Sequence, residues 1–317
     1  MNTESHTVVV ATVTLNPAID RTIAIPNFAA GAVNRVVSER DSAGGKGVNV
    51  ASVLADCGLR AGVTGFLGRE NAASFEALFA QKKIVDRFVR IAGRTRLGIK
   101  IIDPVLKLTT DINFPGLAPG AEDVAALRER LCMLKSAWWV VAGSVPVGLD
   151  PAICREIVAA LKERGARVVV DASGSALRQA IEAGPRIIKP NLEEFRELVG
   201  KPLADTGSVI GAARELLGKG QKGIELVAVS MGREGACFVT ATEAVIAHSP
   251  DVEVGSTVGA GDAMVAGIVA AQIRGLALEE CARLASAFSL RALTQASLAE
   301  AMSQVAVERS VLDRGPH

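Results

Sequence analysis

The chain has 317 residues, of which 49% are hydrophobic and 22% charged, the composition of a globular protein with a large buried core. Its 35 basic and 34 acidic residues leave a net charge of +1, so it lacks the one-sided field typical of proteins that bind nucleic acid or a membrane surface. No stretch approaches the roughly 20 apolar residues that a membrane-spanning helix needs. We therefore expect neither a nucleic-acid partner nor a membrane partner.

The amino-terminal residues and the cysteines indicate in which cellular compartment the protein is expected. Residues 1–6 have no basic segment of the kind that opens a secretory signal peptide. The five cysteines are widely scattered, with no C-x-x-C pair to suggest a metal site. We expect the cysteines to be reduced and mostly buried, and the protein to be cytoplasmic.

Short runs of β-branched residues alternate with helix-period segments along most of the chain. The runs predict buried strands at residues 7–14, 138–142, 167–171, 186–189 and 225–230. The helix-period segments predict helices at residues 48–56, 122–134, 151–164, 192–199, 209–217, 262–274 and 278–295. A repeated order of strand and then helix indicates an α/β fold with a parallel sheet covered on both faces. Length alone allows two domains or one large α/β domain with an appendage.

Two stretches interrupt this alternation, at residues 19–38 and 94–114. Neither contains a convincing helix, and residues 99–102 and 109–113 predict a hairpin around 104–107. Four short strands inserted into an α/β chain would form a small antiparallel sheet that stands off the main body. We therefore predict a lid that is discontinuous in sequence.

Polar residues follow several of the predicted strands. In an α/β sheet, ligands bind beyond the carboxyl ends of the parallel strands, so side chains at these ends are candidates for a binding site. The residues in question are Asn16, Ser144, Asp171, Lys189, Asn191 and Ser230.

The segment at residues 255–262, GSTVGAGD, runs directly into an apolar helical stretch. Gly259, Ala260 and Gly261 would therefore lie at a helix N-terminus, where backbone N–H groups and the positive end of the helix dipole attract anions. Asp262 in the first turn would be held ionised by about 0.3–1 kcal/mol from the dipole and could accept a proton from a hydroxyl. A glycine-rich loop before an aspartate is also a common helix start, so this segment alone fits either interpretation.

Neither of the two familiar nucleotide fingerprints is present. The P-loop pattern G-x-x-x-x-G-K-[ST] fails because Gly47 follows Lys46, and the dinucleotide pattern G-x-G-x-x-G fails because Met264 replaces its third glycine. A nicotinamide-dependent oxidoreductase is therefore a weak interpretation.

A second glycine cluster, at residues 43–51, also runs into a predicted helix. Its Gly44, Gly45, Lys46 and Asn49 could offer backbone donors, a positive charge and an amide to a polyhydroxylated anion. The alternative is a flexible loop with a solvated lysine.

Single polar residues elsewhere have both a functional and a structural interpretation. Asp20, after the first strand, offers a carboxylate suited to sugar hydroxyls, although such a residue is often structural. Asn191 and Glu194 have the spacing of a capping box, and they could equally hold the water shell of a phosphate-bound Mg²⁺. Lys189 could contact a nucleotide phosphate or be a solvated lysine at a strand end.

Three motifs together give a resemblance that covers nearly the whole chain. They are AGGKGVN at 43–49, KPNLEE at 189–194 and VGAGD at 258–262. In this order they resemble the ribokinase-like carbohydrate kinases, the PfkB family. TLNPAID at 14–20 and TDINFPG at 110–116 are similar to the phosphosugar branch of that family, which includes the bacterial 1-phosphofructokinases and tagatose-6-phosphate kinases.

The resemblance implies a fold and an assembly. It implies one ribokinase-like kinase domain over residues 1–317, a three-layer α/β/α domain with a mainly parallel sheet. It also implies a small antiparallel β-sheet lid, formed by residues of about 19–38 and 94–114, and a homodimer formed through that lid.

The resemblance also implies the roles of individual residues. Sugar binding would involve Asp20, Gly44, Gly45, Lys46 and Asn49, and the phosphate already on the sugar would be held or flanked by Arg35, Arg96 and Ser144. ATP and Mg²⁺ would be bound by Lys189, Asn191, Glu194, Ser230, Gly232 and Gly235, with the Mg²⁺ held through water by Asn191 and Glu194. Asp262 would be the catalytic base, beside the backbone of Gly259, Ala260 and Gly261.

The implied reaction is the ATP-dependent phosphorylation of fructose 1-phosphate at its C6 hydroxyl, which gives fructose 1,6-bisphosphate. The alternatives are tagatose 6-phosphate or fructose 6-phosphate as the acceptor, or a non-catalytic sugar-phosphate sensor. Two positions depart from the family pattern, because relatives often have asparagine where Gly98 stands and some have lysine near Ala32.

Overall fold

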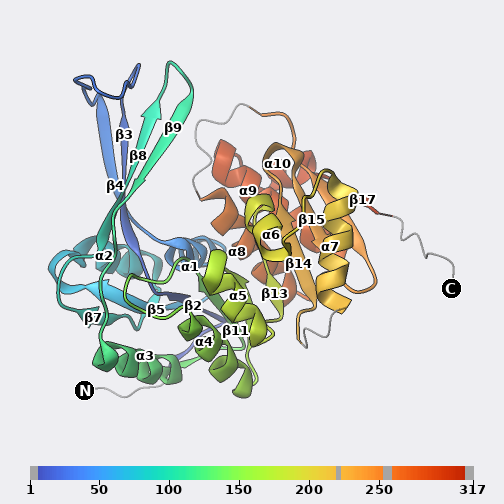
Figure 1. Cartoon of the computed structure of the whole chain (residues 1–317), viewed down its shortest axis with the longest axis horizontal. Helices are drawn as coiled ribbons and strands as arrows, with labels where there is room; N and C mark the ends of the chain where they lie inside the picture. Colours follow the sequence, from blue (N-terminus) through green and yellow to red (C-terminus); the bar gives the residue numbers. More distant parts are fainter. Residues whose placement is uncertain (1–5, 219–222, 253–258, 311–317) are drawn as a thin grey trace. The chain divides into compact units, whose positions relative to one another are not determined.

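The computed structural model describes residues 6–218, 223–252 and 259–310. The chain divides into two compact units (Figure 1). The first comprises Met1–Lys135 and Gly143–Leu149, and the second comprises Ser136–Ala142 and Asp150–His317. In the described part of the chain, no helix combines the length and the apolar character needed to cross a membrane.

Parallel strands form the centre of the first unit. β2 (Val10–Thr14) pairs with β5 (Ala61–Gly68), and both are buried along their whole length. β5 also pairs in parallel with β6 (Val85–Asp86) and β7 (Val89–Ile91). The other elements around these strands are α1 (Lys46–Asp56), α2 (Ala73–Lys82), α3 (Ala121–Met133), the 3-10 helix η1 (Arg69–Asn71) and the parallel pair β1 (His6–Thr7) and β10 (Leu134–Lys135).

A separate four-stranded sheet projects from the first unit (Figure 1). Its strand order is β4 (Ser38–Gly44), β3 (Ala18–Ala24), β8 (Arg96–Asp103) and β9 (Leu108–Asn113). The outer pairs are antiparallel, whereas the central pair of β3 and β8 is parallel. The sheet contains the predicted hairpin, formed by β8 and β9. The first lid segment was predicted to end at residue 38, whereas β4 extends the sheet to Gly44.

This small sheet has one polar face and one mainly apolar face, the latter also carrying the ion pair of Arg21 with Asp41. Residues directly opposite each other on paired strands share a face, and successive residues alternate between faces. Asp20 pairs with Gly98, which pairs with Asn113, so these three lie on the polar face. The same rule assigns Lys100 and Asp111 to the polar face. The apolar face carries Ile19, Ile23, Leu97, Ile99, Ile101 and Ile112.

Asp103 holds the far end of the small sheet together. Its side chain accepts hydrogen bonds from the backbone N–H groups of Asn27 at 3.1 Å, Phe28 at 2.7 Å, Val105 at 2.9 Å and Leu106 at 3.0 Å. It thereby joins the loop after β3 to the turn between β8 and β9. Asp103 is 3% exposed, so these bonds are shielded from water.

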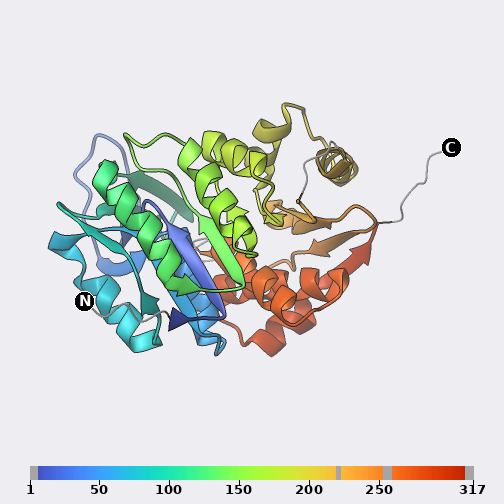
Figure 2. The same ribbon diagram turned by 90° about the horizontal axis from the view of Figure 1, so that it is seen from below.

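The second unit contains a sheet with helices on both faces. Its strand order is β17 (Ala306–Arg309), β16 (Ala244–His248), β15 (Ala236–Val239), β14 (Leu226–Ser230), β13 (Ile187–Ile188), β12 (Arg167–Asp171) and β11 (Trp138–Ala142). The pairs from β11 to β14 are parallel and those from β14 to β17 antiparallel. In Figure 2, the yellow-green helices and the orange-red helices lie on opposite sides of these strands. The helices are α4 (Ala152–Glu163), α5 (Gly174–Glu182), α6 (Leu192–Val199), α7 (Thr206–Gly218), α8 (Ala260–Ile273), α9 (Leu278–Thr294), α10 (Leu298–Gln304) and the 3-10 helix η2 (Gly232–Glu234).

Apolar periodicity explains the two kinds of helix in this unit. α4 buries Ile153, Ile157, Val158 and Leu161 at helical spacing, which leaves its other face in water. α8 is buried around most of its circumference, as its almost wholly apolar sequence requires. The predicted mixed α/β fold, with a mostly parallel sheet and a small separate sheet, is confirmed.

The cysteines mostly follow the expectation. Cys154, Cys237 and Cys281 are buried, Cys57 is partly exposed and Cys132 is exposed, and none of the five forms a disulfide. Burial raises the pKa of the Cys154 thiol to about 11 and that of Cys237 to about 12. These thiols are therefore uncharged and unreactive near neutral pH.

Candidate active site

In the first unit, the predicted sugar-binding loop joins the small sheet to α1. Gly44 ends β4, Gly45 is the N-cap of α1 with a φ of 105°, and Lys46 is the first helical residue. Asn49 is in the first turn, where its N–H donates to the carbonyl of Gly45 at 3.0 Å. This helical turn therefore brings together backbone donors, an ammonium group and an amide. Such a set can bind the hydroxyl groups and the negative charge of an anionic polyol.

Asn16 and Ser144 meet beyond the ends of two strands. The side-chain amide of Asn16 donates to Oγ of Ser144 at 3.1 Å. Lys46 lies close by, because a Cβ placed on Gly143 would lie 3.9 Å from the Cβ of Lys46. Two of the polar residues that follow the predicted strands, Asn16 and Ser144, are thus in direct contact.

Arg96 opens β8 and reaches the same region. One of its terminal nitrogens donates to Oδ1 of Asn113 at 3.3 Å and the other to the carbonyl of Asn16 at 3.4 Å. Both bonds are long, and Nε is buried without a hydrogen-bond partner among the described residues. An arginine offers five N–H donors, so much of its capacity remains available for a phosphate.

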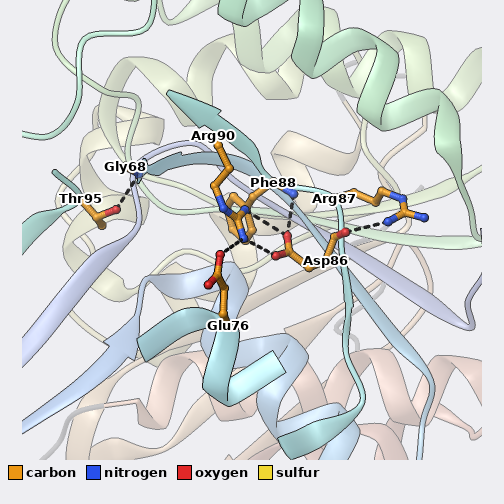
Figure 3. Close-up of polar contacts among 7 residues, drawn as sticks. All are labelled: Gly68, Glu76, Asp86, Arg87, Phe88, Arg90 and Thr95. Carbon is orange, nitrogen blue, oxygen red and sulfur yellow. Dashed lines mark hydrogen bonds and ion pairs between the residues drawn. The ribbon is translucent and has the colours of Figure 1, made fainter. Parts of the chain in front are cut away.

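Thr95 fixes the position at which Arg96 enters the strand. The hydroxyl of Thr95 accepts a bond from the N–H of Gly68 at 2.9 Å (Figure 3). The side chain of Asn71 bonds both the N–H and the carbonyl of Thr95, at 2.8 and 2.9 Å. Gly68 permits this approach, because a Cβ there would lie 2.3 Å from the backbone nitrogen of Thr95. Thr95 is 2% exposed and is a positioning residue that our sequence analysis did not single out.

A second polar cluster in Figure 3 stabilises the strand segment that precedes Thr95. Arg90 bonds Asp86 and also Glu76, the latter at 3.1 Å, and Asp86 accepts a bond from the N–H of Phe88 at 2.9 Å. These contacts link α2 to β6 and β7. These contacts are structural: they hold the segment that leads to Thr95 and to Arg96 at the start of β8.

Asp20 lies in the middle of the polar face of the small sheet. Burial raises the pKa of its carboxyl above the ordinary value of 3.8, the charges of Lys100 and Arg96 lower it, and Asp111 raises it again. The carboxylate lies between Gly44 and Gly98, which leave room for its two oxygens. It is therefore a half-buried acceptor among cations, suited to binding hydroxyl groups.

Arg35 lies at the other end of the small sheet. It belongs to a loop in which Asn34 bonds the backbone of Ala29 and Ala32, and Val37 bonds Ala24 at the far end of β3. β3 has Ala18 opposite Arg96 at its near end. Seven strand residues separate these levels by roughly 20 Å. We therefore expect Arg35 and Arg96 of one chain to contact different phosphates.

In the second unit, Lys189 follows β13 beside the N-terminus of α8. Its Nζ lies 3.6 Å from Oδ1 of Asp171, which ends β12. A Cβ placed on Gly261 would lie 3.7 Å from the same Nζ. The ammonium group of Lys189 and the positive end of the α8 dipole therefore lie side by side. Two positive charges so close together favour the binding of an anion between them.

Asn191 and Glu194 form the capping box that their spacing predicts. Oδ1 of Asn191 accepts from the N–H of Glu194 at 2.8 Å, and Oε2 of Glu194 accepts from the N–H of Asn191 at 2.8 Å. The cap occupies one oxygen of each residue. Within residues 6–218, 223–252 and 259–310, no three His, Cys, Asp or Glu side chains gather as a metal site. Oxygen ligands from this cap, completed by water, still match the preference of Mg²⁺.

Ser230, Gly232 and Gly235 lie next to this cap. Asn191 and Ser230 form a parallel bridge, and the N–H of Ser230 donates to the carbonyl of Pro190 at 3.1 Å. The N–H of Met231 donates to the carbonyl of Gly235 at 2.8 Å, which closes the turn that contains Gly232. The predicted nucleotide residues after β13 and β14 are thus neighbours.

α8 begins as the glycine-rich segment predicts. Gly259 is its N-cap with a φ of 78°, Ala260 and Gly261 open the first turn, and Asp262 follows at 8% exposure. Residues 255–258 of the motif lie outside the described residues. The first-turn N–H groups have no acceptor within the helix, so they are suited to a phosphoryl group beside the carboxylate of Asp262.

Comparison with known proteins gives this arrangement a family. The model of the pfkB family of carbohydrate kinases matches residues 7–304. The chain belongs to the pfkB family of carbohydrate kinases. It is thus a phosphotransferase that acts on an alcohol group, and the predicted family resemblance is confirmed.

Individual pfkB relatives are similar over most of their length. The 1-phosphofructokinase of Rhodobacter capsulatus is 48% identical over 287 residues, which cover 90% of each chain. A structure of phosphofructokinase-2 from Escherichia coli in complex with substrates and products matches with a TM-score of 0.87 and 27% identity, covering 94% of this chain and 98% of that one. A possible 1-phosphofructokinase from Thermotoga maritima matches with a TM-score of 0.83 and 31% identity, covering 96% and 100%.

Proposed function

We propose that this pfkB kinase transfers the γ-phosphoryl group of ATP to the C6 hydroxyl of fructose 1-phosphate, giving fructose 1,6-bisphosphate. The observation that carries the proposal is the 48% identity, over 90% of both chains, to the 1-phosphofructokinase of Rhodobacter capsulatus. Membership of a carbohydrate kinase family implies the use of ATP, and a divalent metal is the usual companion of its phosphates.

The acceptor sugar would be bound by residues of the first unit. Asp20 and the loop of Gly44, Gly45, Lys46 and Asn49 would bind its hydroxyls. Its phosphate would lie beside Arg96 and Ser144, because the guanidinium of Arg96 makes two long hydrogen bonds within the described part of the chain. Ser144 is held in the same region by Asn16 at 3.1 Å.

ATP would be bound by residues of the second unit. Lys189 and the first turn of α8 would hold its phosphates, since both present positive charge to one place. Asn191 and Glu194 would hold Mg²⁺ through water, and Mg²⁺, when bound, supplies charge neutralisation on the phosphates. Ser230, Gly232 and Gly235 would contact the rest of the nucleotide.

Asp262 would act as the general base. Its carboxylate would accept the proton of the C6 hydroxyl as that oxygen attacks the γ-phosphorus and the bond to the β-phosphate oxygen breaks. The N–H groups of Gly259, Ala260 and Gly261 would stabilise the charge on the transferred group. The small sheet would act as a lid over the acceptor and limit the access of water.

Initial rates with Mg-ATP and fructose 1-phosphate, fructose 6-phosphate or tagatose 6-phosphate test the proposal. We expect the highest kcat/KM with fructose 1-phosphate. A similar structure of Escherichia coli phosphofructokinase-2 is in complex with fructose 6-phosphate, which makes this sugar the second candidate acceptor. A higher kcat/KM with fructose 6-phosphate or tagatose 6-phosphate would instead assign the chain to the 6-phosphofructokinases or the tagatose-6-phosphate kinases. If no sugar leads to ADP formation, a non-catalytic sugar-phosphate sensor would be favoured. The cytoplasmic location stays a prediction.

A homodimer formed through the small sheet completes the proposal. Its apolar face carries Ile112, which is 44% exposed, and the same strand begins with Leu108 at 60% exposed, so burial of these residues by a second copy would be favourable. Arg35 lies too far from Arg96 to share its phosphate within one chain, so we assign it to the phosphosugar of the partner copy.

Mixing two inactive variants tests the role of Arg35 across the dimer. In a heterodimer of Arg35→Ala and Asp262→Asn chains, one site keeps an intact Asp262 together with Arg35 from the other chain. We therefore expect activity to return after the two variants are unfolded and refolded together. If Arg35 serves its own chain, the mixture stays inactive.

A further inference from the structure

The carboxylate of Asp20 lies between two glycines of neighbouring strands. A Cβ placed on Gly44 of β4 would lie 2.2 Å from Oδ2, and a Cβ placed on Gly98 of β8 would lie 2.8 Å from Oδ1. Gly98 is directly opposite Asp20 in the pairing of β3 with β8. Each oxygen of the carboxylate therefore occupies space that a side chain on one neighbouring strand would fill.

The two glycines differ in what surrounds them. A Cβ on Gly44 would also lie 3.4 Å from the carbonyl oxygen of Ala18, whereas the next contacts of a Cβ on Gly98 are with side-chain atoms, Oδ1 of Asn113 at 3.8 Å and Cβ of Ala18 at 3.9 Å. Gly98 also lacks a positive φ, so its backbone conformation is open to other residues. An alanine at position 98 would therefore displace only the end of the Asp20 side chain.

Displacement of this carboxylate has a chemical consequence. Arg96 and Lys100 attract it from one strand and Asp111 repels it from the next, so its position on the polar face is set by opposing charges as well as by space. Hydrogen bonds between a carboxylate and hydroxyls depend steeply on distance and angle. A small shift of the two oxygens changes which hydroxyl arrangement they can bind.

We propose that Gly98 determines acceptor specificity: by leaving the space that Oδ1 of Asp20 occupies, it sets where this carboxylate binds the sugar hydroxyls. The inference rests on the proposed function, in which Asp20 contacts the acceptor. Gly98 itself acts through Asp20 and is a positioning residue. The size of the residue at position 98 is then the feature that selects among phosphosugars.

The test is the Gly98→Ala variant. We expect KM for fructose 1-phosphate to rise about tenfold or more, as loss of a well-formed charged hydrogen bond implies, while KM for ATP stays within about twofold. The ratio of kcat/KM between fructose 1-phosphate and tagatose 6-phosphate should change as well. Gly211→Ala is the matched control, because a Cβ there meets nothing within 4 Å, and it should leave both KM values unchanged.

A double-mutant cycle with Asp20→Asn separates positioning from a general effect. If Gly98 acts through the carboxylate, Gly98→Ala should add less than about twofold to KM in the Asp20→Asn background. A full additional effect in that background, or equal rises in both KM values, would overturn the inference. Loss of the folded circular dichroism spectrum by Gly98→Ala would overturn it too, because the alanine should displace the Asp20 side chain and leave β8 in place.

The wild-type rates distinguish failure of this inference from failure of the proposed function. A wild-type chain that forms no ADP with any phosphosugar removes the proposed function, and this inference with it. An active wild-type chain whose acceptor preference and KM survive Gly98→Ala removes the inference alone.

Discussion

Nζ of Lys189 lies 3.6 Å from Oδ1 of Asp171, and the two residues are 3% and 1% exposed. They follow or end neighbouring parallel strands, so the pair is fixed at the carboxyl edge of the sheet in the second unit. The same ammonium group lies beside Gly261 at the start of α8. We therefore expect Lys189 to have two roles that can be separated, one in the stability of the unit and one in binding phosphate.

Replacement of Lys189 by methionine tests both roles. Because the variant leaves Asp171 buried without its cation, the free energy of unfolding should fall by about 3–5 kcal/mol, measured by urea denaturation. KM for ATP should rise. In the double variant with Asp171→Asn, much of the stability should return while KM for ATP stays high. Recovery of both quantities together would show that Lys189 affects ATP only through the fold.

Arg96 should matter for the acceptor and not for ATP. We expect Arg96→Ala to raise KM for the phosphosugar by about 10²-fold, the value of one or two charged hydrogen bonds, and to leave KM for ATP nearly unchanged. Arg94→Ala is the matched control, because Arg94 is exposed and lies two positions earlier in the chain. Steady-state kinetics with each substrate varied in turn checks this, and equal effects on both substrates would contradict a phosphate contact.

The sequence predicts elements that depend on local pattern and misses those that depend on distant contacts. The ranges expected for β11, β12 and α6 match the structure, because continuous apolar runs and a capping box define them locally. β5 was missed, since its three glycines weaken any strand signal. One of them, Gly65, is required because a Cβ there would lie 1.8 Å from the carbonyl oxygen of Thr14, on a strand far away in sequence.

In the candidate site, too, local motifs can be predicted from the sequence and contacts between distant residues cannot. Its motifs make Asp262, Lys189 and Lys46 candidates, because each lies in a segment that resembles the pfkB family. The supporting contacts are invisible in the chain, because Thr95 meets Gly68 and Asp20 meets Gly98 only after strands pair. Arg35 and Arg96 could be assigned to one phosphate from the sequence, whereas the strand register separates them within a chain.

Asp103 should make the stability of the small sheet depend on pH. Burial alone would raise the pKa of its carboxyl, but bonds from the N–H groups of Leu106, Phe28, Val105 and Asn27 outweigh it and hold the pKa below the ordinary value of 3.8. A lowered pKa in the folded state contributes stability that is fully present above 3.8 and is lost as the pH falls through the folded value.

The Asp103→Asn variant checks this dependence. Its deficit in unfolding free energy relative to wild type should be constant above about pH 5 and shrink below about pH 4. Unfolding curves between pH 2 and pH 7 measure it. Asp56→Asn is the control, because Asp56 forms a surface ion pair with Lys82 and is 46% exposed, so its removal should change stability little. A deficit that does not change with pH would contradict an ionised Asp103 as the acceptor of the four bonds.

Asp262→Asn should separate chemistry from binding. The amide keeps the shape of the first turn of α8 but cannot accept the hydroxyl proton, so kcat should fall by about 10²- to 10⁴-fold, the usual value of general-base help. KM for the sugar should change little, because the proposed sugar contacts come from Asp20 and the loop at Gly44. The measurement is kcat and KM from coupled ADP release, with the thermal midpoint as a check on folding. Near-normal turnover by Asp262→Asn would show that the proton leaves by another route and that Asp262 serves only to start the helix.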